Sequence, residues 1–503
     1  MGARRAESAA MNTKSVAAAL AIGAAVLAGP AAAAESRPGL KPCRLQGVEN
    51  DAWCGVLKRP LDPARPQGTQ VDIHYAVIPA LARNRKPDPV LFFAGGPGQS
   101  AMDLAGPVSR MLARLSNRRD VVLVDQRGTG RSAPLPCDDT APTAPLSEVL
   151  DTARQLEKLR ACRSRLQALP HGDLRHYTTW VAMQDADAVR VALGAAQVNL
   201  VGGSYGTRAA LEYLRQFPQA VRRVVIDGVA PPDMVLPASF STDNQAALDA
   251  VFSACEAEPA CRTRHPALRS EWHGLLRSLP REVSVMHPVT GAVQRVQMTR
   301  DGLVSLVRGP LYAPILASAL PQAMADAAQG RFEGLVGLAG ALGGGRAGRI
   351  SEGMHFSVVC SEDLPRLDSA SDVPGADFGN SFAALYREVC KDWPRGEVPA
   401  AFYTLAPSRA PVLLLSGGAD PVTPPRHGER VAQALGARAR HVVVPQAGHG
   451  VMAIGCLRDA LFRFIDAESD DDALKTDANC AAAMPRPPAF QPVTAPSGVE
   501  AAK

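Results

Sequence analysis

The chain of 503 residues lacks a dense run of basic residues, and its formal net charge of +5 is small for its length. Proteins that bind nucleic acid concentrate Lys and Arg on one face or in one segment, so the sequence predicts no nucleic-acid partner. Internal repeats are also absent. With 46% hydrophobic and 20% charged residues, the composition is globular, and the length suffices for a large core with a substantial insertion.

Cysteine patterns that hold metal ions are missing as well. None of the ten cysteines forms a Cys-x-x-Cys pair, and no histidine pair with ligand spacing lies near them. We therefore predict no metal site. The even number of cysteines fits disulfides formed in an oxidising compartment. The sequence does not fix their pairing, but neighbour pairing is the simplest interpretation because each bond closes a short loop: Cys43–Cys54, Cys137–Cys162, Cys255–Cys261, Cys360–Cys390 and Cys456–Cys480.

Long hydrophobic runs are scarce. The run at residues 16–27 is too short to span a bilayer comfortably, and Lys14 precedes it. The A-x-A site at residues 32–34 predicts a signal peptide over 1–34, and a start at Met11 would make this signal more compact. A membrane anchor or a buried helix is the alternative interpretation. No cysteine sits at the cleavage site, so a lipoprotein is not indicated, and we expect a secreted or periplasmic protein without stable membrane association.

A candidate nucleophile lies in the stretch Gly202-Gly203-Ser204-Tyr205-Gly206, which reads G-x-S-x-G. An apolar run at 198–201 precedes it and a helical pattern at 207–214 follows. Strand, sharp turn and helix form the context of a nucleophile elbow, in which the residues beside the serine must be small. We predict Ser204 as the nucleophile. The alternative is a glycine-rich turn with an idle serine.

A base and an acid follow in the order that this motif requires. An apolar strand at 411–416 leads to Asp420, and the strand predicted at 441–445 leads to His449 in a glycine-flanked loop. His449 would take the serine proton, and Asp420 would orient its ring. Asp459 competes with Asp420 but falls after the histidine, which is the wrong order.

Two backbone N–H groups are expected to bind an oxyanion. Tyr205 directly follows the serine, and the strand predicted at 90–93 leads into Gly95 and Gly96. Consecutive glycines allow a backbone amide to approach a ligand closely. We favour Gly96 as the second donor, with Gly95 possible and a plain glycine turn as the alternative.

Together, these motifs give the chain a family resemblance. Gly95–Gly98, Asp125–Ser132, Gly202–Gly206, Asp420 and His449 occur in one order. From about residue 40 to 480, the chain resembles α/β hydrolases of the proline iminopeptidase and tripeptidyl aminopeptidase group. These are serine exopeptidases that act at a free N-terminus without a cofactor. The long, cysteine-bearing secreted chain looks more like the tripeptidyl aminopeptidase branch.

The resemblance also bears on the substrate. The proline iminopeptidase branch usually has a histidine before Gly-Gly-Pro-Gly, where this chain has Ala94. Related aminopeptidases carry an acidic stretch after a cysteine, and Glu362 and Asp363 follow Cys360. An exopeptidase must bind a charged amine, so these two acids are predicted to bind substrate, with Glu352 a weaker candidate. Two exposed loop acids are the alternative.

The expected architecture is an α/β-hydrolase fold with a mostly parallel sheet, helices on both faces and an inserted, mainly helical cap. Its ligand site should lie at the carboxyl ends of the strands. Asp125 and Arg127 also lie at such an end, where their expected role is structural. The predicted divisions are 35–231 and 406–480 for the core, 232–405 for the cap and 481–503 for a flexible tail.

The predicted function is therefore that of a secreted serine hydrolase, most simply an aminopeptidase whose partner is a peptide with a free N-terminus. The pattern does not distinguish release of one residue from release of three. A carboxylesterase with the same three residues is the alternative, because one fold hosts both chemistries. A binding protein that kept the fold without catalysis is a more remote alternative.

Overall fold

The computed structural model describes residues 37, 39–137, 141–341 and 348–492. The predicted signal peptide, both candidate start methionines and the last eleven residues lie outside the described residues. None of the described helices combines the length and the hydrophobicity that crossing a membrane would require.

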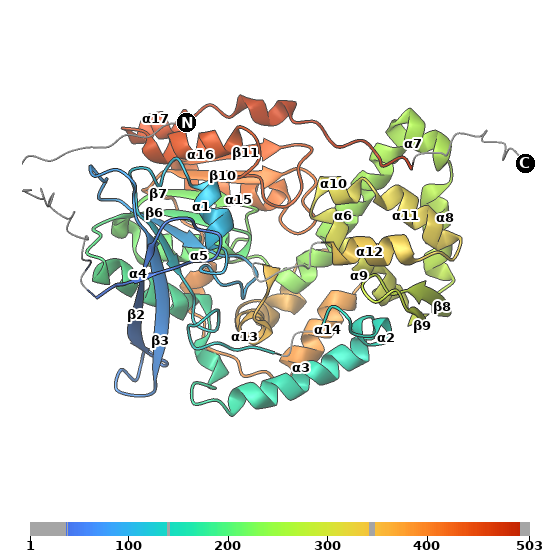
Figure 1. Cartoon of the computed structure of the whole chain (residues 1–503), viewed down its shortest axis with the longest axis horizontal. Helices are drawn as coiled ribbons and strands as arrows, with labels where there is room; N and C mark the ends of the chain where they lie inside the picture. The colour runs from blue at the N-terminus through green and yellow to red at the C-terminus, as the bar shows by residue number, and fades with distance from the viewer. Residues whose placement is uncertain (1–36, 38, 138–140, 342–347, 493–503) are drawn as a thin grey trace, which may run out of the picture. The chain divides into compact units, whose positions relative to one another are not determined.

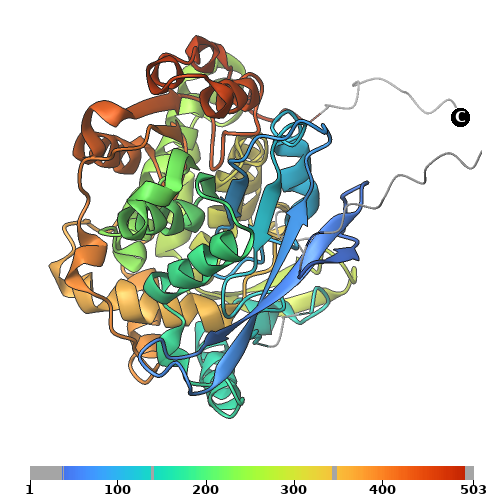
Figure 2. The same ribbon diagram turned by 90° about the vertical axis from the view of Figure 1, so that its left-hand side faces the viewer.

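A nine-stranded sheet forms the centre of the fold (Figure 1), in the order β1-β2-β3-β5-β4-β6-β7-β10-β11. The run from β5 to β11 is parallel, whereas β1, β2 and β3 form an antiparallel edge that joins β5. The expected mostly parallel sheet is thus confirmed. Figure 2 shows its twist, with the long strands β2 and β3 in blue. The strands of the sheet are β1 Lys41–Cys43, β2 Ala52–Pro60, β3 Gln70–Ile78, β4 Val90–Phe93, β5 Val121–Val124, β6 Val198–Gly203, β7 Val221–Asp227, β10 Val412–Gly417 and β11 Ala439–Val444.

Both faces of the sheet are covered, which explains why its central strands are continuous apolar runs rather than alternating ones. All four residues of β4 are buried. Leu91 and Phe93 belong to one hydrophobic core, and Val90 and Phe92 belong to the other. The helices along the two core parts of the chain are α1 Ala105–Met111, α2 Leu146–Val149, α3 Thr152–Gln167, α4 Thr179–Ala192, α5 Tyr205–Gln216, α15 Pro425–Leu435, α16 Leu457–Asp466 and α17 Asp470–Leu474.

The long segment between β7 and β10 is mainly helical, as expected. It also contains an antiparallel hairpin, β8 Arg281–Met286 and β9 Val293–Met298, which the sequence analysis did not predict. Helices α9, α11 and α12 share a separate hydrophobic core with this hairpin (Figure 1). The helices of this segment are α6 Leu236–Ala257, α7 Pro259–Arg264, α8 Leu268–Arg277, α9 Arg300–Leu311, α10 Pro314–Ala317, α11 Leu320–Ala328, α12 Glu333–Gly340, α13 Glu352–Glu362 and α14 Ser381–Cys390.

The cap packs against other parts of the chain at two places. Phe356 and Val359 on α13 belong to a core of the central sheet rather than to the separate core of the cap. After the last strand, the backbone N–H groups of Ala489 and Phe490 donate to the Glu258 side chain and the Ser318 carbonyl. The described part of the predicted flexible tail is therefore attached to the cap. The boundaries at 232 and 405 stay a prediction.

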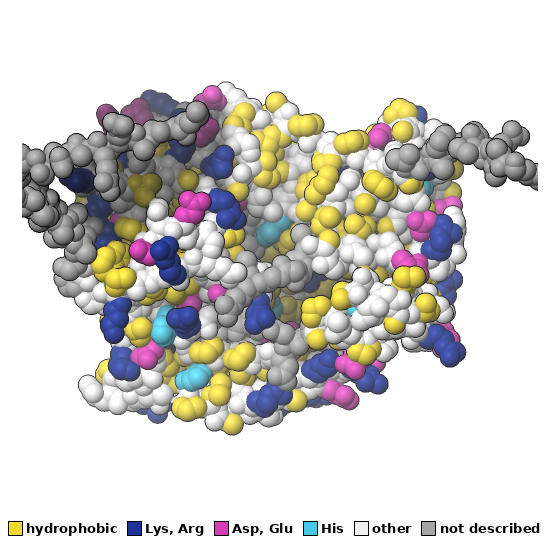
Figure 3. Space-filling model, in the orientation of Figure 1, with side chains coloured by type: hydrophobic (Ala, Val, Ile, Leu, Met, Phe, Trp, Pro, Cys, Tyr) yellow, Lys and Arg dark blue, Asp and Glu magenta, His cyan; other side chains and the backbone are white. Residues whose placement is uncertain are grey.

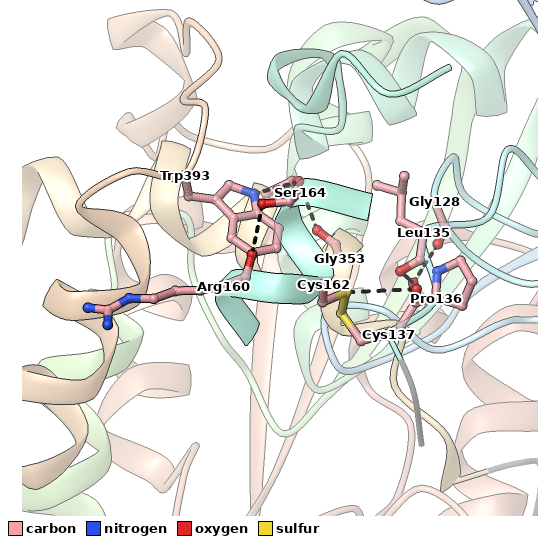
Figure 4. The surroundings of a disulfide bond; sticks show 11 residues. Gly128, Leu135, Pro136, Cys137, Arg160, Cys162, Ser164, Gly353 and Trp393 are labelled. Carbon is pink, nitrogen blue, oxygen red and sulfur yellow. Dashed lines mark hydrogen bonds between the residues drawn. A yellow bond between two sulfur atoms is a disulfide. The ribbon is translucent and has the colours of Figure 1, made fainter. Parts of the chain in front are cut away.

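All five disulfides predicted by neighbour pairing are confirmed. The bond between Cys137 and Cys162 joins the loop after β5 to α3 (Figure 4). Beside it, the N–H of Gly353 at the start of α13 donates to the Leu135 carbonyl. A core loop, a core helix and a cap helix therefore meet at this bond.

Arg127 has the structural role expected for it. Its side chain is 1% exposed and forms two hydrogen bonds to the Asp185 carboxylate on α4, at 2.7 and 3.0 Å. It also donates to the backbone carbonyls of Leu61 and His176. The guanidinium thus provides hydrogen bonds to backbone carbonyl groups, and it holds the loop after β5 against α4.

We predict that Arg127→Met lowers the free energy of unfolding by about 3 kcal/mol, because it leaves a buried carboxylate with a poorer partner. Arg59→Met is the matched control, since Arg59 contacts the same Asp185 at 3.1 Å but is 29% exposed. That control should cost less than about 1 kcal/mol. Denaturant unfolding of both variants measures the difference, and equal losses would contradict a special role for Arg127.

Candidate active site

Ser204 lies in a strained turn between β6 and α5. Its φ of +57° is rare for a residue with a side chain. A Cβ atom at Gly202 would lie 2.3 Å from the Gly206 carbonyl oxygen, and one at Gly206 would lie 2.2 Å from that of Phe93. The elbow therefore requires glycine at both flanking positions, as the sequence predicts for small residues. The turn holds Ser204 at the carboxyl end of β6, where its side chain is partly exposed.

Asp420 and His449 form a hydrogen-bonded pair at the same side of the sheet as Ser204, beyond the carboxyl ends of β10 and β11. His449 Nδ1 lies 2.8 Å from Asp420 Oδ2, and the Asp420 side chain is fully buried. Its other oxygen accepts the N–H groups of Val422 and Thr423, both at 2.9 Å. With Nδ1 donating to the carboxylate, Nε2 is the ring nitrogen that can take a proton.

Asp227, at the end of β7, connects this histidine loop to the elbow. Its backbone carbonyl accepts the N–H of Ser204 at 2.8 Å. Its carboxylate Oδ2 accepts the N–H groups of Val451 and Met452, at 2.6 and 2.7 Å. No motif in the sequence pointed to Asp227, which is the last residue of β7. Asp227 therefore links the backbone at Ser204 to the backbone that follows His449.

Burial and neighbouring charges shift the pKa values of the three titratable groups in this cluster. Burial raises the pKa of Asp227 to about 6. Burial also opposes the ionised form of Asp420, but its contacts with His449 and two N–H groups hold its pKa below the ordinary value. Burial alone would lower the pKa of His449, yet the Asp420 carboxylate outweighs it and the net shift is upward. The pair therefore favours an imidazolium beside a carboxylate.

A cleft of about 890 Å³ opens beside the serine. Ser204, Gly96 and Tyr205 line it from the core, so the candidate nucleophile and both expected oxyanion donors face the same cleft. A Cβ atom at Gly95 would lie 3.3 Å from that of Ser204, so this glycine loop packs directly on the elbow. Figure 3 shows basic and acidic side chains mixed over the visible face, without a large patch of one sign. The other residues that line the cleft come mainly from α3, α6, α9, α13 and α14.

Glu362 and Asp363 do not lie in an exposed loop, so that alternative is wrong. They end helix α13, where their side chains are fully buried. Asp363 forms two hydrogen bonds of 3.0 Å to Arg208, and Glu362 lies 3.3 Å from the same guanidinium. Arg208 lines the cleft, and Glu352 does as well. Their predicted binding of substrate stays a prediction, but the observed partner of both acids is Arg208.

Glu362 is also linked, through Thr179, to Tyr205, the residue after Ser204. Glu362 accepts the N–H and the hydroxyl of Thr179, at 2.6 and 3.0 Å. The Thr179 hydroxyl lies 2.6 Å from the Tyr205 hydroxyl. Burial raises the pKa of Glu362 to about 7. No sequence signal joined these residues, because Thr179 and Glu362 are separated by 183 positions.

Metal ligation is not evident at this site. Within the described ranges, no group of three or more His, Cys, Asp or Glu side chains could hold a metal ion. The chemistry available there is that of a hydroxyl, an imidazole, a carboxylate and backbone N–H groups.

Two family models match the chain. One, described as alpha/beta hydrolase fold, matches residues 88–263, and the other, described as TAP-like protein, matches residues 375–480. The first match contains the glycine loop and the elbow, and the second contains Asp420 and His449. Both parts of the site therefore fall within matched regions.

The curated proteins that resemble this chain are named for different activities. "Serine protease Hip1" of Mycobacterium tuberculosis is 25% identical over 432 residues, covering 78% of this chain and 82% of that protein. "Tripeptidyl aminopeptidase" of Streptomyces lividans is 34% identical over 194 residues, covering 36% of this chain and 35% of that protein. "Carboxylesterase B" of Mycobacterium tuberculosis is 29% identical over 439 residues, covering 77% of this chain and 78% of that protein.

Asp227 provides a test of how the histidine loop is held. Asp227→Ala removes the acceptor of two backbone N–H groups, so we expect it to lower the free energy of unfolding by about 2 kcal/mol. Asp227→Asn keeps a carbonyl oxygen in that place and is the matched control. Thermal and denaturant unfolding of both variants measures the difference. An alanine variant as stable as the wild type would show that these hydrogen bonds do not hold the loop.

The difference in stability between Asp227→Asn and the wild type should change with pH in a defined direction. The pKa of Asp227 is about 6 in the folded protein, against about 3.9 in an unfolded chain. This group's contribution to stability is fully present below pH 4 and is lost as the pH rises through 6. Asp227→Asn does not undergo this loss, so its stability relative to the wild type should improve between pH 4 and pH 7.

Proposed function

We propose that this chain, a serine hydrolase of the α/β-hydrolase superfamily, is an exported aminopeptidase that cleaves peptides at a free N-terminus through an acyl-enzyme. The observation that carries the proposal is the hydrogen-bonded pair of Asp420 and His449 at the sheet edge that also presents the strained Ser204. A serine hydroxyl becomes an effective nucleophile when such a pair takes its proton.

The proposed reaction begins when His449 Nε2 takes the proton of Ser204 as its oxygen attacks the carbonyl carbon. The buried Asp420 stabilises the imidazolium, and the N–H groups of Tyr205 and Gly96 stabilise the oxyanion. His449 then gives the proton to the leaving amine, whose bond to the acyl group breaks. The same histidine activates water, which releases the acyl group and restores the serine.

Support for a peptide substrate comes from the TAP-like match and from relatives named as a serine protease and a tripeptidyl aminopeptidase. The five disulfides are consistent with export to an oxidising compartment. Esterase activity is the second candidate, because a relative of similar coverage is named carboxylesterase B. The two functions differ in whether a free amine is required.

Paired fluorogenic amides test this difference. One member of each pair carries a free N-terminus and the other an acetylated one, across Pro, Ala and tripeptide acyl groups, with a short-chain ester alongside. We expect turnover of only the free-amine amides, at a rate that falls by several orders of magnitude in Ser204→Ala, with stability nearly unchanged. Ester cleavage without amide turnover would identify an esterase, and a fully active Ser204→Ala variant would contradict the proposed nucleophile.

The raised pKa of His449 predicts the pH profile. The base acts when neutral, so kcat/KM should fall as the pH drops through a value above 6.5, the ordinary histidine value. Asp420→Asn removes the carboxylate that raises this pKa, so the acid limb should move to lower pH while kcat drops by about 10⁴-fold. Asp459→Asn is the control, because its exposed carboxylate pairs with Arg114 on the surface. An acid limb that does not move in Asp420→Asn would contradict the assigned pair.

A further inference from the structure

Arg308, on helix α9, places a guanidinium in the wall of the cleft that also contains Ser204. Its central carbon lies 4.8 Å from the ring centre of Phe240 on α6 and 5.0 Å from that of Phe382 on α14. These rings lie edge to face, 6.0 Å apart. Two aromatic contacts from two other helices therefore fix where the guanidinium lies.

The charge of Arg308 has no carboxylate partner in the part of the chain that the structure describes. Its buried Nε atom has no hydrogen-bond partner there, and the contact from Nη2 to the Tyr312 hydroxyl is long, at 3.4 Å. In contrast, Arg208 in the same cleft contacts two carboxylates. Removing a guanidinium donor from water without a partner is costly. The fold thus leaves at Arg308 a cation that an anionic ligand would satisfy.

A single residue, Tyr312, contacts both Arg308 and His449, the candidate base. Tyr312 accepts the backbone N–H of His449 at 2.9 Å through its carbonyl. The Tyr312 ring also lies edge to face with the His449 ring, with ring centres 5.1 Å apart. An anion bound by Arg308 would therefore lie in the cleft, with Tyr312 between it and the candidate base.

Arg308 is one of several cations that line the cleft, together with Lys158, Arg165, Arg208 and Arg349. His355 contacts the Tyr386 hydroxyl at 2.7 Å and the Pro97 carbonyl at 3.2 Å. Burial lowers the pKa of His355 to about 4, so its ring is neutral at pH 7. Among the described residues that line the cleft, Glu352 is the acidic one.

We propose that Arg308 binds a carboxylate of the peptide substrate. This carboxylate belongs either to an acidic side chain on the N-terminal side of the cleaved bond or to the C-terminus of a short peptide. The inference rests on the proposed aminopeptidase function and names a substrate class for it. A guanidinium can bind a carboxylate through two donors at its edge while its faces contact aromatic rings.

The test uses two arms, each a ratio within one protein. In the first, fluorogenic peptide amides with free N-termini carry Glu or Gln at each position before the cleaved bond. In the second, short peptides end in a free carboxylate or in a carboxamide. We expect the acidic member to be favoured in one arm, and Arg308→Met to reduce that ratio of kcat/KM values by about ten- to a hundredfold.

Two further variants separate binding from folding. Arg308→Lys keeps the positive charge but not the paired donors, so it should retain part of the preference. Arg300→Met is the matched control on the same helix, since Arg300 donates to the backbone carbonyls of Ala376 and Asp377 and does not line the cleft. It should leave both ratios unchanged, and melting temperatures check that every variant is folded.

The outcomes distinguish this inference from the function on which it rests. Equal turnover of Glu and Gln peptides and of acids and carboxamides, unchanged by Arg308→Met, would overturn the inference and leave the aminopeptidase intact. The positive arm identifies the source of the carboxylate. Failure to cleave any free-amine peptide, with turnover of esters, would overturn the proposed function and the inference together.

Discussion

The site depends on one backbone constraint, the close approach of β6, β4 and the start of α5 at the elbow. Gly206 lies so near the Phe93 carbonyl that a methyl group there would lie 2.2 Å from its oxygen. This approach forces Ser204 into its positive φ and positions the N–H of Tyr205 at the start of a helix. The burial of the surrounding strands supplies the stability that maintains such strain.

Buried charge is the second constraint, and most of it is neutralised within the fold. Asp420 is matched by His449, and Arg127 by Asp185. Arg208 is matched by the acids that end α13, which attaches the cap to the helix directly after Ser204. Each pair joins segments far apart in the sequence, so the pairs act as long-range links as well as compensating for desolvation. Against this background, Arg308 stands out as an arginine in the cleft wall that pairs with no acid among the described residues.

Much of this architecture could be predicted from the sequence because its signals are local. The strand at Val90–Phe93 coincides with its predicted range, and the elbow, the mainly helical cap and the five disulfides follow from short motifs or spacing. The hairpin at 281–298 was missed although its first strand alternates in burial. The burial of Glu362 could not be foreseen, because it results from a partner 154 positions away.

Short local motifs identify the residues proposed to react, whereas the residues that would select the substrate come together only through long-range contacts. The proposed reacting groups follow strand ends of the sheet, and this fold hosts both esterases and peptidases. Selectivity must come from the cleft wall, where α9, α13 and α14 contribute side chains that no short motif identifies. The aromatic contacts of Arg308 show how such a wall acquires a fixed charge, because two apolar rings orient the guanidinium and neither neutralises it. Substrate choice in this chain can therefore change with the cap while the sheet edge stays the same.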